Sequence, residues 1–158
     1  MIRNVRAADL PACLEVIRKS FATVAEEFGL TPENCPTHTS FVPLSRLEGE
    51  FQRGDEMYAL FQGEVMVGFA QLASQGDGAF ELKKLAVLPE YRHLGYGRQL
   101  LDHVWRRALA LGGRRLTVGI IEESAVLKEW YQRNGFRPTG TRRFDHLPFL
   151  VGYLERTL

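Results

Sequence analysis

The sequence predicts an α/β fold of the α+β type, in which one mixed, mostly antiparallel sheet carries helices on both faces. Three observations predict it. The 158 residues fit a single domain that spans residues 1–158. Residues 80–121 have the pattern strand, helix, strand, and a crossover of this kind implies one parallel pair of strands. The other neighbouring strands are separated by short turns that are typical of antiparallel hairpins.

The first part of the chain is expected to be mainly helical. After a short strand over residues 2–6, Leu10, Leu14, Ile17 and Phe21 recur near helical spacing and indicate an amphipathic helix. The elements expected next are a short helix over 24–28 that ends at Gly29, a loop over 31–40 and a helix over 45–52.

The rest of the chain combines strands with two helices. Gly63 and Glu64 form a tight turn between two apolar runs, which predicts a hairpin. Pro89 ends the third strand of this meander, and Gly112 and Gly113 end the long helix that follows. The expected elements are strands over 57–62, 65–73 and 80–88, a helix over 96–111, a strand over 116–121, a helix over 125–133, and strands over 137–144 and 150–155.

Composition and charge argue against several classes of protein. Hydrophobic residues make up 45% of the chain and charged residues 25%, which is typical of a globular protein and not of a disordered or fibrous one. Because 20 basic side chains stand against 19 acidic ones, no nucleic acid or membrane is expected as a partner. Cys13 and Cys35 are too few for a disulfide framework, and no signal or membrane-spanning segment is found. A cytoplasmic protein is therefore expected.

The most informative stretch joins an apolar strand to the long helix. Pro89 breaks the strand, and the pattern Arg92-x-x-Gly95-x-Gly97 opens the helix. Glycines at such a turn let successive backbone N–H groups approach a phosphate, which the helix N-terminus also favours. Leu100 stands where a dinucleotide fingerprint has its third glycine, and no Gly-Lys-Ser/Thr follows as in a nucleoside-triphosphate loop. The stretch therefore predicts an anion site of neither type, with a plain glycine-rich turn as the alternative.

The pattern Val87-x-Pro-x-x-Arg-x-x-Gly-x-Gly resembles the acyl-CoA-binding motif of the GNAT superfamily, the acetyl-CoA-dependent N-acetyltransferases. The order of elements also resembles that fold over nearly the whole chain. The resemblance implies acetyl-CoA as the acetyl donor, and it implies that backbone groups of Leu85 and Val87 pair with the pantetheine arm. The residues that it places around the coenzyme pyrophosphate are Arg92, His93, Leu94, Gly95, Tyr96, Gly97 and Arg98.

Residues 124–136 are similar to a later motif of the family, an aromatic residue and a tyrosine followed by Gly-Phe. The resemblance matches Tyr131 to the tyrosine whose hydroxyl lies by the coenzyme sulfur and protonates the departing thiolate. Packing of the helix against the sheet is the alternative role for Tyr131. Ser124 stands where many members have asparagine, so it is expected to replace only part of the hydrogen bonding to the cofactor arm.

Acetyl transfer to an amine requires the amine to lose its proton, and Glu81 is the candidate base. Some family members place their catalytic glutamate at the equivalent position near the start of the motif strand. Strict alternation along this strand would put Glu81, Lys83, Leu85 and Val87 on one face, with the carboxylate on the side of the cofactor-facing residues. A surface glutamate paired with Lys83 is the alternative.

In the family, the loop between the first two helices and the hairpin between the last two strands wall the acceptor pocket. The resemblance therefore gives weak candidates for acceptor contacts: Thr37, His38, Ser40, Asp145, His146 and Phe149. Cys35 and His38 have a metal-like spacing, but no second pair accompanies them, so no metal is expected. Family members often form homodimers, although no segment of this chain indicates one.

Two hypotheses follow for the function. In the first, the protein transfers an acetyl group from acetyl-CoA to a primary amine of a small molecule or peptide by direct attack in a ternary complex. Glu81, directly or through water, would be the base and Tyr131 the acid. In the second, the protein is an acyl-CoA-binding regulatory module with little or no catalysis, which needs neither residue.

The near-zero net charge is expected to conceal two sides of opposite sign. The side of the coenzyme would be basic through Lys83, Lys84, Arg92 and Arg98. The side of the acceptor would be more acidic through Glu26, Glu27 and Glu33, which suits a cationic amine.

Overall fold

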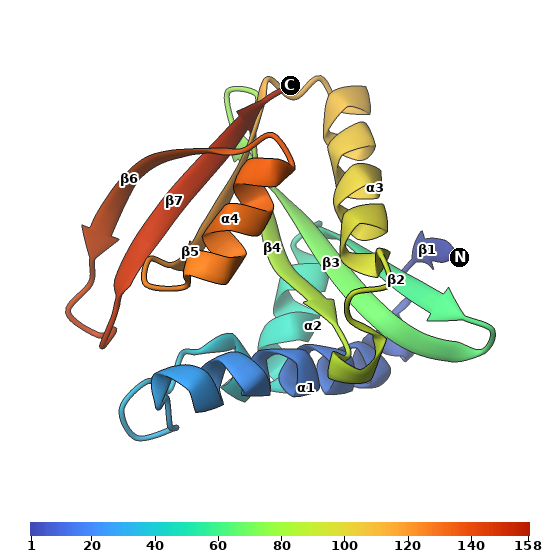
Figure 1. The fold of residues 1–158 in the computed structure, drawn as a ribbon. Coiled ribbons are helices and arrows are strands. Elements are labelled where there is room, and N and C mark those ends of the chain that lie inside the picture. Colours follow the sequence, from blue (N-terminus) through green and yellow to red (C-terminus); the bar gives the residue numbers. More distant parts are fainter.

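The computed structural model describes residues 1–158 and contains one seven-stranded sheet in the order β1-β2-β3-β4-β5-β7-β6 (Figure 1). Only β4 and β5 pair in parallel, and every other pair of neighbours is antiparallel. The strands are β1 (Ile2–Asn4), β2 (Glu56–Gln62), β3 (Val65–Gly76), β4 (Ala79–Val87), β5 (Arg115–Ile121), β6 (Arg137–Arg143) and β7 (Leu150–Thr157). The predicted mixed, mostly antiparallel sheet with one parallel pair is confirmed.

Helices cover both faces of the sheet, as predicted (Figure 1). One apolar cluster joins the sheet to the first two helices through Ile17 and Leu47, and a second joins it to the last two through Leu100 and Tyr131. None of the helices has the length and apolar composition that a membrane span requires. The helices are α1 (Leu10–Phe28), α2 (Leu44–Gln52), α3 (Tyr96–Ala110) and α4 (Ala125–Arg133), with 3-10 turns at Ala7–Asp9, Thr39–Phe41 and Pro89–Tyr91.

The N-terminal helix differs from the expectation. Instead of ending near Phe21 and restarting over 24–28, α1 continues to Phe28 as one helix of 19 residues. No glycine or proline interrupts that part of the chain, and the Thr23 hydroxyl donates to the carbonyl of Ser20 at 2.9 Å within the helix. The helix ends where Gly29 adopts a left-handed conformation with a φ of 64°.

β4 and β5 separate soon after they pair. Their ladder contains three residue pairs, from Ala79 with Arg115 to Glu81 with Thr117, although both strands continue beyond it. Figure 1 shows the two strands diverging from this point, with α4 beside β5. The divergence opens the middle of the sheet without breaking the core on either side.

A β-bulge interrupts β4. The register against β3 shifts between the pairs Phe69–Ala86 and Gln71–Lys83, and Lys84 has a φ of 52°. Because the bulge inserts one residue, Leu85 packs with the cluster under α3, whereas Lys83 approaches Asp55 on the opposite face. The expectation that residues 81, 83, 85 and 87 share one face is therefore wrong, since alternation does not continue through a bulge.

Candidate active site

The turn before α3 carries a series of backbone N–H groups without partners. His93 and Gly95 both adopt left-handed conformations, with φ values of 63° and 85°, and α3 begins at Tyr96. No backbone N–H from His93 to Arg98 donates to another group of the protein; the first that does belongs to Gln99, which donates to the carbonyl of Gly95 at 3.1 Å. Unpaired N–H groups at a turn and a helix N-terminus form an anion site, so the backbone fits a pyrophosphate.

The Arg92 side chain ties this turn to α1. Its guanidinium donates to the Ser20 carbonyl at 2.8 Å, the Thr23 hydroxyl at 3.0 Å and the Ser20 hydroxyl at 3.3 Å. On the other side, a Cβ added to Gly97 would lie 3.5 Å from the Trp130 ring of α4. The turn is therefore held between α1 and α4, and the Arg92 charge serves this anchoring rather than lying free as the sequence suggested.

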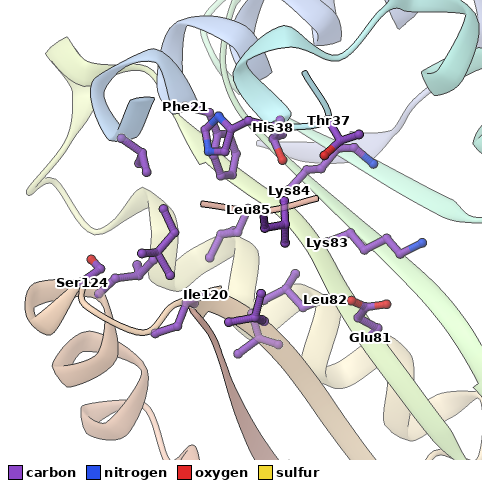
Figure 2. Close-up of a pocket in the computed structure, with 18 of the residues that line it drawn as sticks. Phe21, Thr37, His38, Glu81, Leu82, Lys83, Lys84, Leu85, Ile120 and Ser124 are labelled. Carbon is purple, nitrogen blue, oxygen red and sulfur yellow. The ribbon is translucent and has the colours of Figure 1, made fainter. Parts of the chain in front are cut away.

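A cavity of about 520 Å³ occupies the gap between the diverging strands. Leu82–Leu85 of β4 form one wall and Val118–Ile121 of β5 the other, and Ser124 and Tyr131 close the side toward α4. Figure 2 shows Ser124 at one end of the cavity and Glu81 and Lys83 at the other, with Phe21, Thr37 and His38 along the side between them. The cavity is also lined by Val24, Thr39, Val42, Arg46, Glu50, Leu127, His146, Leu147, Phe149, Val151 and Tyr153.

Tyr131 lies in the wall of this cavity. Its ring makes edge contacts with Trp130 and Phe136 at centroid distances of 5.0 and 5.3 Å, and burial raises the pKa of its hydroxyl. The Tyr131 hydroxyl has no hydrogen-bond partner in the protein. Every fully buried side-chain polar atom does have such a partner, so this hydroxyl is not fully buried and opens onto the cavity. Tyr131 thus packs α4 and also presents a neutral O–H donor to the gap.

Glu81 also lines the cavity, at the end of the short parallel ladder. One of its carboxylate oxygens accepts a hydrogen bond from Gln75 Nε2 at 2.8 Å. Burial raises the pKa of the Glu81 carboxyl, and the charges of Lys83 and Lys84 oppose that rise. Its carboxyl therefore retains a proton to higher pH than an exposed glutamate does, which suits a group that exchanges protons.

The two segments expected to wall an acceptor pocket do line the cavity, through Thr37 and His38 and through His146 and Phe149. Ser40 does not line it, but its backbone N–H donates to His38 Nδ1 at 3.2 Å, and its hydroxyl lies 2.7 Å from the same atom. Asp145 is likewise outside the lining, and so is Val87, which packs instead against the core under α3.

A buried polar network beneath the cavity was not predicted. Lys84 Nζ donates to Glu50 Oε1 at 2.5 Å and to Gln71 Oε1 at 3.1 Å, and the side chains of Lys84 and Glu50 are only 10% and 6% exposed. Gln71 Nε2 donates in turn to Glu50 at 3.1 Å and to Asp55 at 2.7 Å. The network joins α2, β3 and the bulge of β4, and so fixes the cavity wall where Lys84 has a positive φ.

The charges around the cavity differ from the expectation. Glu26, Glu27 and Glu33 are outside its lining, so they do not make the acceptor side acidic. The charged groups that do line it are Arg46, Glu50, Glu81, Lys83 and Lys84. On the side of the turn, Lys84 and Arg92 are committed to protein partners, and only Arg98 is largely exposed. Fewer unpaired charges are therefore present on the acceptor side and on the side of the turn than the sequence suggested.

Comparison with known proteins identifies the family. The model of the acetyltransferase (GNAT) domain matches residues 53–138, more than half of the chain. The chain belongs to the GNAT acetyltransferase family. An uncharacterised N-acetyltransferase of Mycobacterium tuberculosis is 33% identical over 132 residues, which cover 78% of this chain and 84% of the relative. An amino-acid acetyltransferase of Pseudomonas putida is 33% identical over 131 residues, 82% of this chain but only 29% of that protein's length.

Solved structures show the same fold as this GNAT protein. The ribosomal-protein-S18-alanine N-acetyltransferase of Escherichia coli superposes with a TM-score of 0.79 at 20% identity, over 99% of this chain and 92% of that one. An N-acetyltransferase of Thermoplasma acidophilum in complex with coenzyme A gives 0.74 at 21% identity, over 100% and 98% of the two chains. These likenesses concern the fold alone.

The acetyltransferases of this family use acetyl-CoA as the acetyl donor. The unpaired N–H groups from His93 to Arg98 fit the pyrophosphate of that donor. No group of three histidine, cysteine, aspartate or glutamate side chains is arranged to hold a metal ion.

Proposed function

We propose that this GNAT enzyme transfers the acetyl group of acetyl-CoA to a primary amine of a small-molecule or peptide acceptor, by direct attack in a ternary complex. The observation that carries the proposal is the continuity of the site. The turn with unpaired N–H groups is anchored to the part of α1 from which Phe21 and Val24 line the cavity, and the Tyr131 hydroxyl opens onto the same cavity. A donor held at the turn would extend its acetyl end into the cavity that Tyr131 and Glu81 both line.

In this proposal, the N–H groups of residues 93–98 hold the pyrophosphate, and Arg98 adds an exposed positive charge. The backbone of Leu85 and Val87 pairs with the pantetheine arm along the edge of β4 that β5 leaves free beyond Glu81. Ser124, at the end of the cavity opposite Glu81 and Lys83, donates one hydrogen bond to this arm. The donor is thus bound largely by backbone groups, which preorganise it at little entropic cost.

The proposed chemistry uses two residues of opposite role. Glu81, directly or through water, removes a proton from the acceptor ammonium, and the free amine nitrogen then forms a bond to the acetyl carbon. The bond between that carbon and sulfur breaks, and the Tyr131 hydroxyl gives its proton to the thiolate. The nitrogen then loses its second proton, which returns through water to the Tyr131 oxygen and leaves a neutral amide. Like an ordinary tyrosine, Tyr131 carries its proton at neutral pH, and burial raises the pKa of its hydroxyl further, so it gives up this proton only to a strong base such as a departing thiolate.

The proposal is tested by measuring release of free coenzyme A thiol with amino acids, polyamines, aminoglycosides, peptide N-termini and protein lysines as acceptors. Acetyl-CoA should also raise the melting temperature by mass action. A thermal shift without thiol release from any amine would favour the acyl-CoA-binding module instead. No shift at donor concentrations well above micromolar would contradict both functions.

We place the reaction in the cytoplasm, where the free thiols of Cys13 and Cys35 stay reduced.

Replacing Arg92 with methionine should weaken acetyl-CoA binding about tenfold, which corresponds to about 1.4 kcal/mol. The substitution removes the three hydrogen bonds that hold the turn to α1, so the N–H groups of residues 93–98 lose their fixed geometry. Calorimetric titration measures the affinity. Arg106→Met, on the exposed side of α3, is the matched control and should leave it unchanged. Equal affinities for the two variants would show that the anchor does not matter for binding.

The acidic limb of the pH profile should report Glu81. A base must be deprotonated to work, so kcat/KM is expected to fall as the pH drops through the raised pKa of the Glu81 carboxyl. In Glu81→Gln, the overall rate should drop, and this limb should disappear. A limb that persists unchanged in Glu81→Gln would assign the proton transfer to another group.

A further inference from the structure

We propose that the acceptor carries a carboxylate near its reacting amine, as a free amino acid or short peptide does, and that Arg46 and Lys83 bind that carboxylate. The inference rests on the proposed function and names the class of its acceptor. The cationic side chains that line the cavity differ in how many of their hydrogen-bond donors have a partner in the protein.

Two of the three Lys84 N–H donors are used, since the ammonium donates to Glu50 and Gln71 inside the buried network. Arg46 and Lys83 also line the cavity, but neither donates a hydrogen bond to a protein group. Their nearest carboxylates are Glu50 Oε2, at 3.9 Å from Arg46 Nε, and Asp55 Oδ2, at 3.8 Å from Lys83 Nζ. Both distances exceed a hydrogen bond, so the two cations keep free donors.

Both neighbouring carboxylates are already used by other groups. Glu50 accepts from Lys84 and Gln71, and Asp55 accepts from Gln71. Arg46 lies one helical turn before Glu50 on α2, and Glu50 reaches Lys84 on β4, directly after Lys83. Arg46 and Lys83 therefore both lie close to the Glu50–Lys84 pair, and Figure 2 shows Lys83 at the end of the cavity away from Ser124.

His38 supplies a third donor along the same cavity. The contact of the Ser40 backbone N–H with its Nδ1, at 3.2 Å, favours the tautomer of the neutral ring that carries its proton on Nε2. The ring is 9% exposed, burial lowers its pKa and thereby favours the neutral form, and no protein group accepts from Nε2. A neutral N–H donor in the wall of the same cavity suits a carboxylate, whereas it offers nothing to an ammonium group.

Only Glu81 remains as a carboxylate that can face an incoming amine, because Glu50 is buried in its network. Arg46, Lys83 and Glu81 together present two positive charges and one negative charge. A zwitterion matches this pattern, with its amine toward Glu81 and its carboxylate toward Arg46 and Lys83. A polyamine would instead bring additional positive charges against two cations.

The test compares acceptors that differ only in the carboxylate. Thiol release is measured with the common amino acids, with their α-amides and with spermidine, and kcat and KM are determined for the best amino acid and its amide. The free acid should exceed its amide in kcat/KM by at least tenfold. Arg46→Met and Lys83→Met should each raise KM for the acid by tenfold or more and leave KM for the amide nearly unchanged.

Arg53→Met is the matched control. Arg53 Nη2 lies 3.9 Å from Glu50 Oε2, the same distance as Arg46 Nε, but Arg53 does not line the cavity. The preference for the free acid over its amide should therefore survive in Arg53→Met. Amides or spermidine that react as well as the acids would overturn the inference while supporting acetyl transfer to amines. If Arg46→Met and Lys83→Met raised KM equally for the acid and for the amide, the inference would also be overturned. If acetyl-CoA binds but no amine is acetylated, the proposed function fails as well.

Discussion

Tyr131→Phe should lower kcat about 100-fold while leaving the affinity for acetyl-CoA nearly unchanged. The variant keeps the ring that packs between Trp130 and Phe136 and loses only the hydroxyl that opens onto the cavity. Loss of a positioned general acid typically costs a factor of about 10²–10⁴ in rate. Because the thiolate would then leave without a proton donor, the effect should appear in kcat and not in binding.

Thiol release at saturating acetyl-CoA and acceptor measures this effect, and calorimetric titration of the donor measures binding. Tyr153→Phe is the control, because Tyr153 also lines the cavity but has no proposed part in the chemistry. It should retain most of the activity. An unchanged kcat in Tyr131→Phe with a good acceptor would remove Tyr131 from the mechanism and leave it as a packing residue of α4.

Glu50→Ala should lower the free energy of unfolding by about 3–5 kcal/mol, the range expected when one partner of a buried ion pair is removed. The Lys84 ammonium would remain 10% exposed with no carboxylate, and Gln71 would lose one acceptor. Since Lys84 is the bulge residue of β4, the cavity wall should loosen as well. Denaturation by urea, followed by circular dichroism, measures the change.

Two further variants separate the buried charge from the loss of side-chain volume. Glu50→Leu combined with Lys84→Met removes both charges and should recover most of the stability, because apolar replacement of a buried pair is often neutral. Lys19→Ala breaks the exposed pair with Glu15 and should leave the free energy of unfolding almost unchanged. A Glu50→Ala protein as stable as Lys19→Ala would show that the buried pair contributes little to the fold.

Features that depend on consecutive residues could be predicted from the sequence. The turn from Pro89 to Arg98 and the helix after it were predicted from the proline and glycines of the turn, and the structure has both, whereas binding of the pyrophosphate there stays a prediction. The strand-helix-strand unit followed from hydrophobic periodicity, and the parallel pairing of β4 with β5 confirms it. The place of Tyr131 in the cavity wall agrees with its motif, whereas its role in proton transfer stays a prediction.

Features that depend on contacts between distant segments could not be predicted. Lys84 pairs with Glu50 and Arg92 with Ser20, across 34 and 72 residues, and no spacing in the sequence signals either contact. The bulge at Lys84 has no glycine or asparagine to mark its positive φ, so alternation was assumed to continue. These pairings engage Lys84 and Arg92, so the sequence could not show which basic side chains stay without partners.

Amide hydrogen exchange with and without acetyl-CoA tests the central claim most directly. The account predicts that the donor slows exchange of the N–H groups from His93 to Arg98, which have no acceptor within the protein. Protection should also appear along the edge of β4 near Leu85, and be absent from β6, whose seven residues are all exposed. Binding of acetyl-CoA without protection of residues 93–98 would contradict the proposed site.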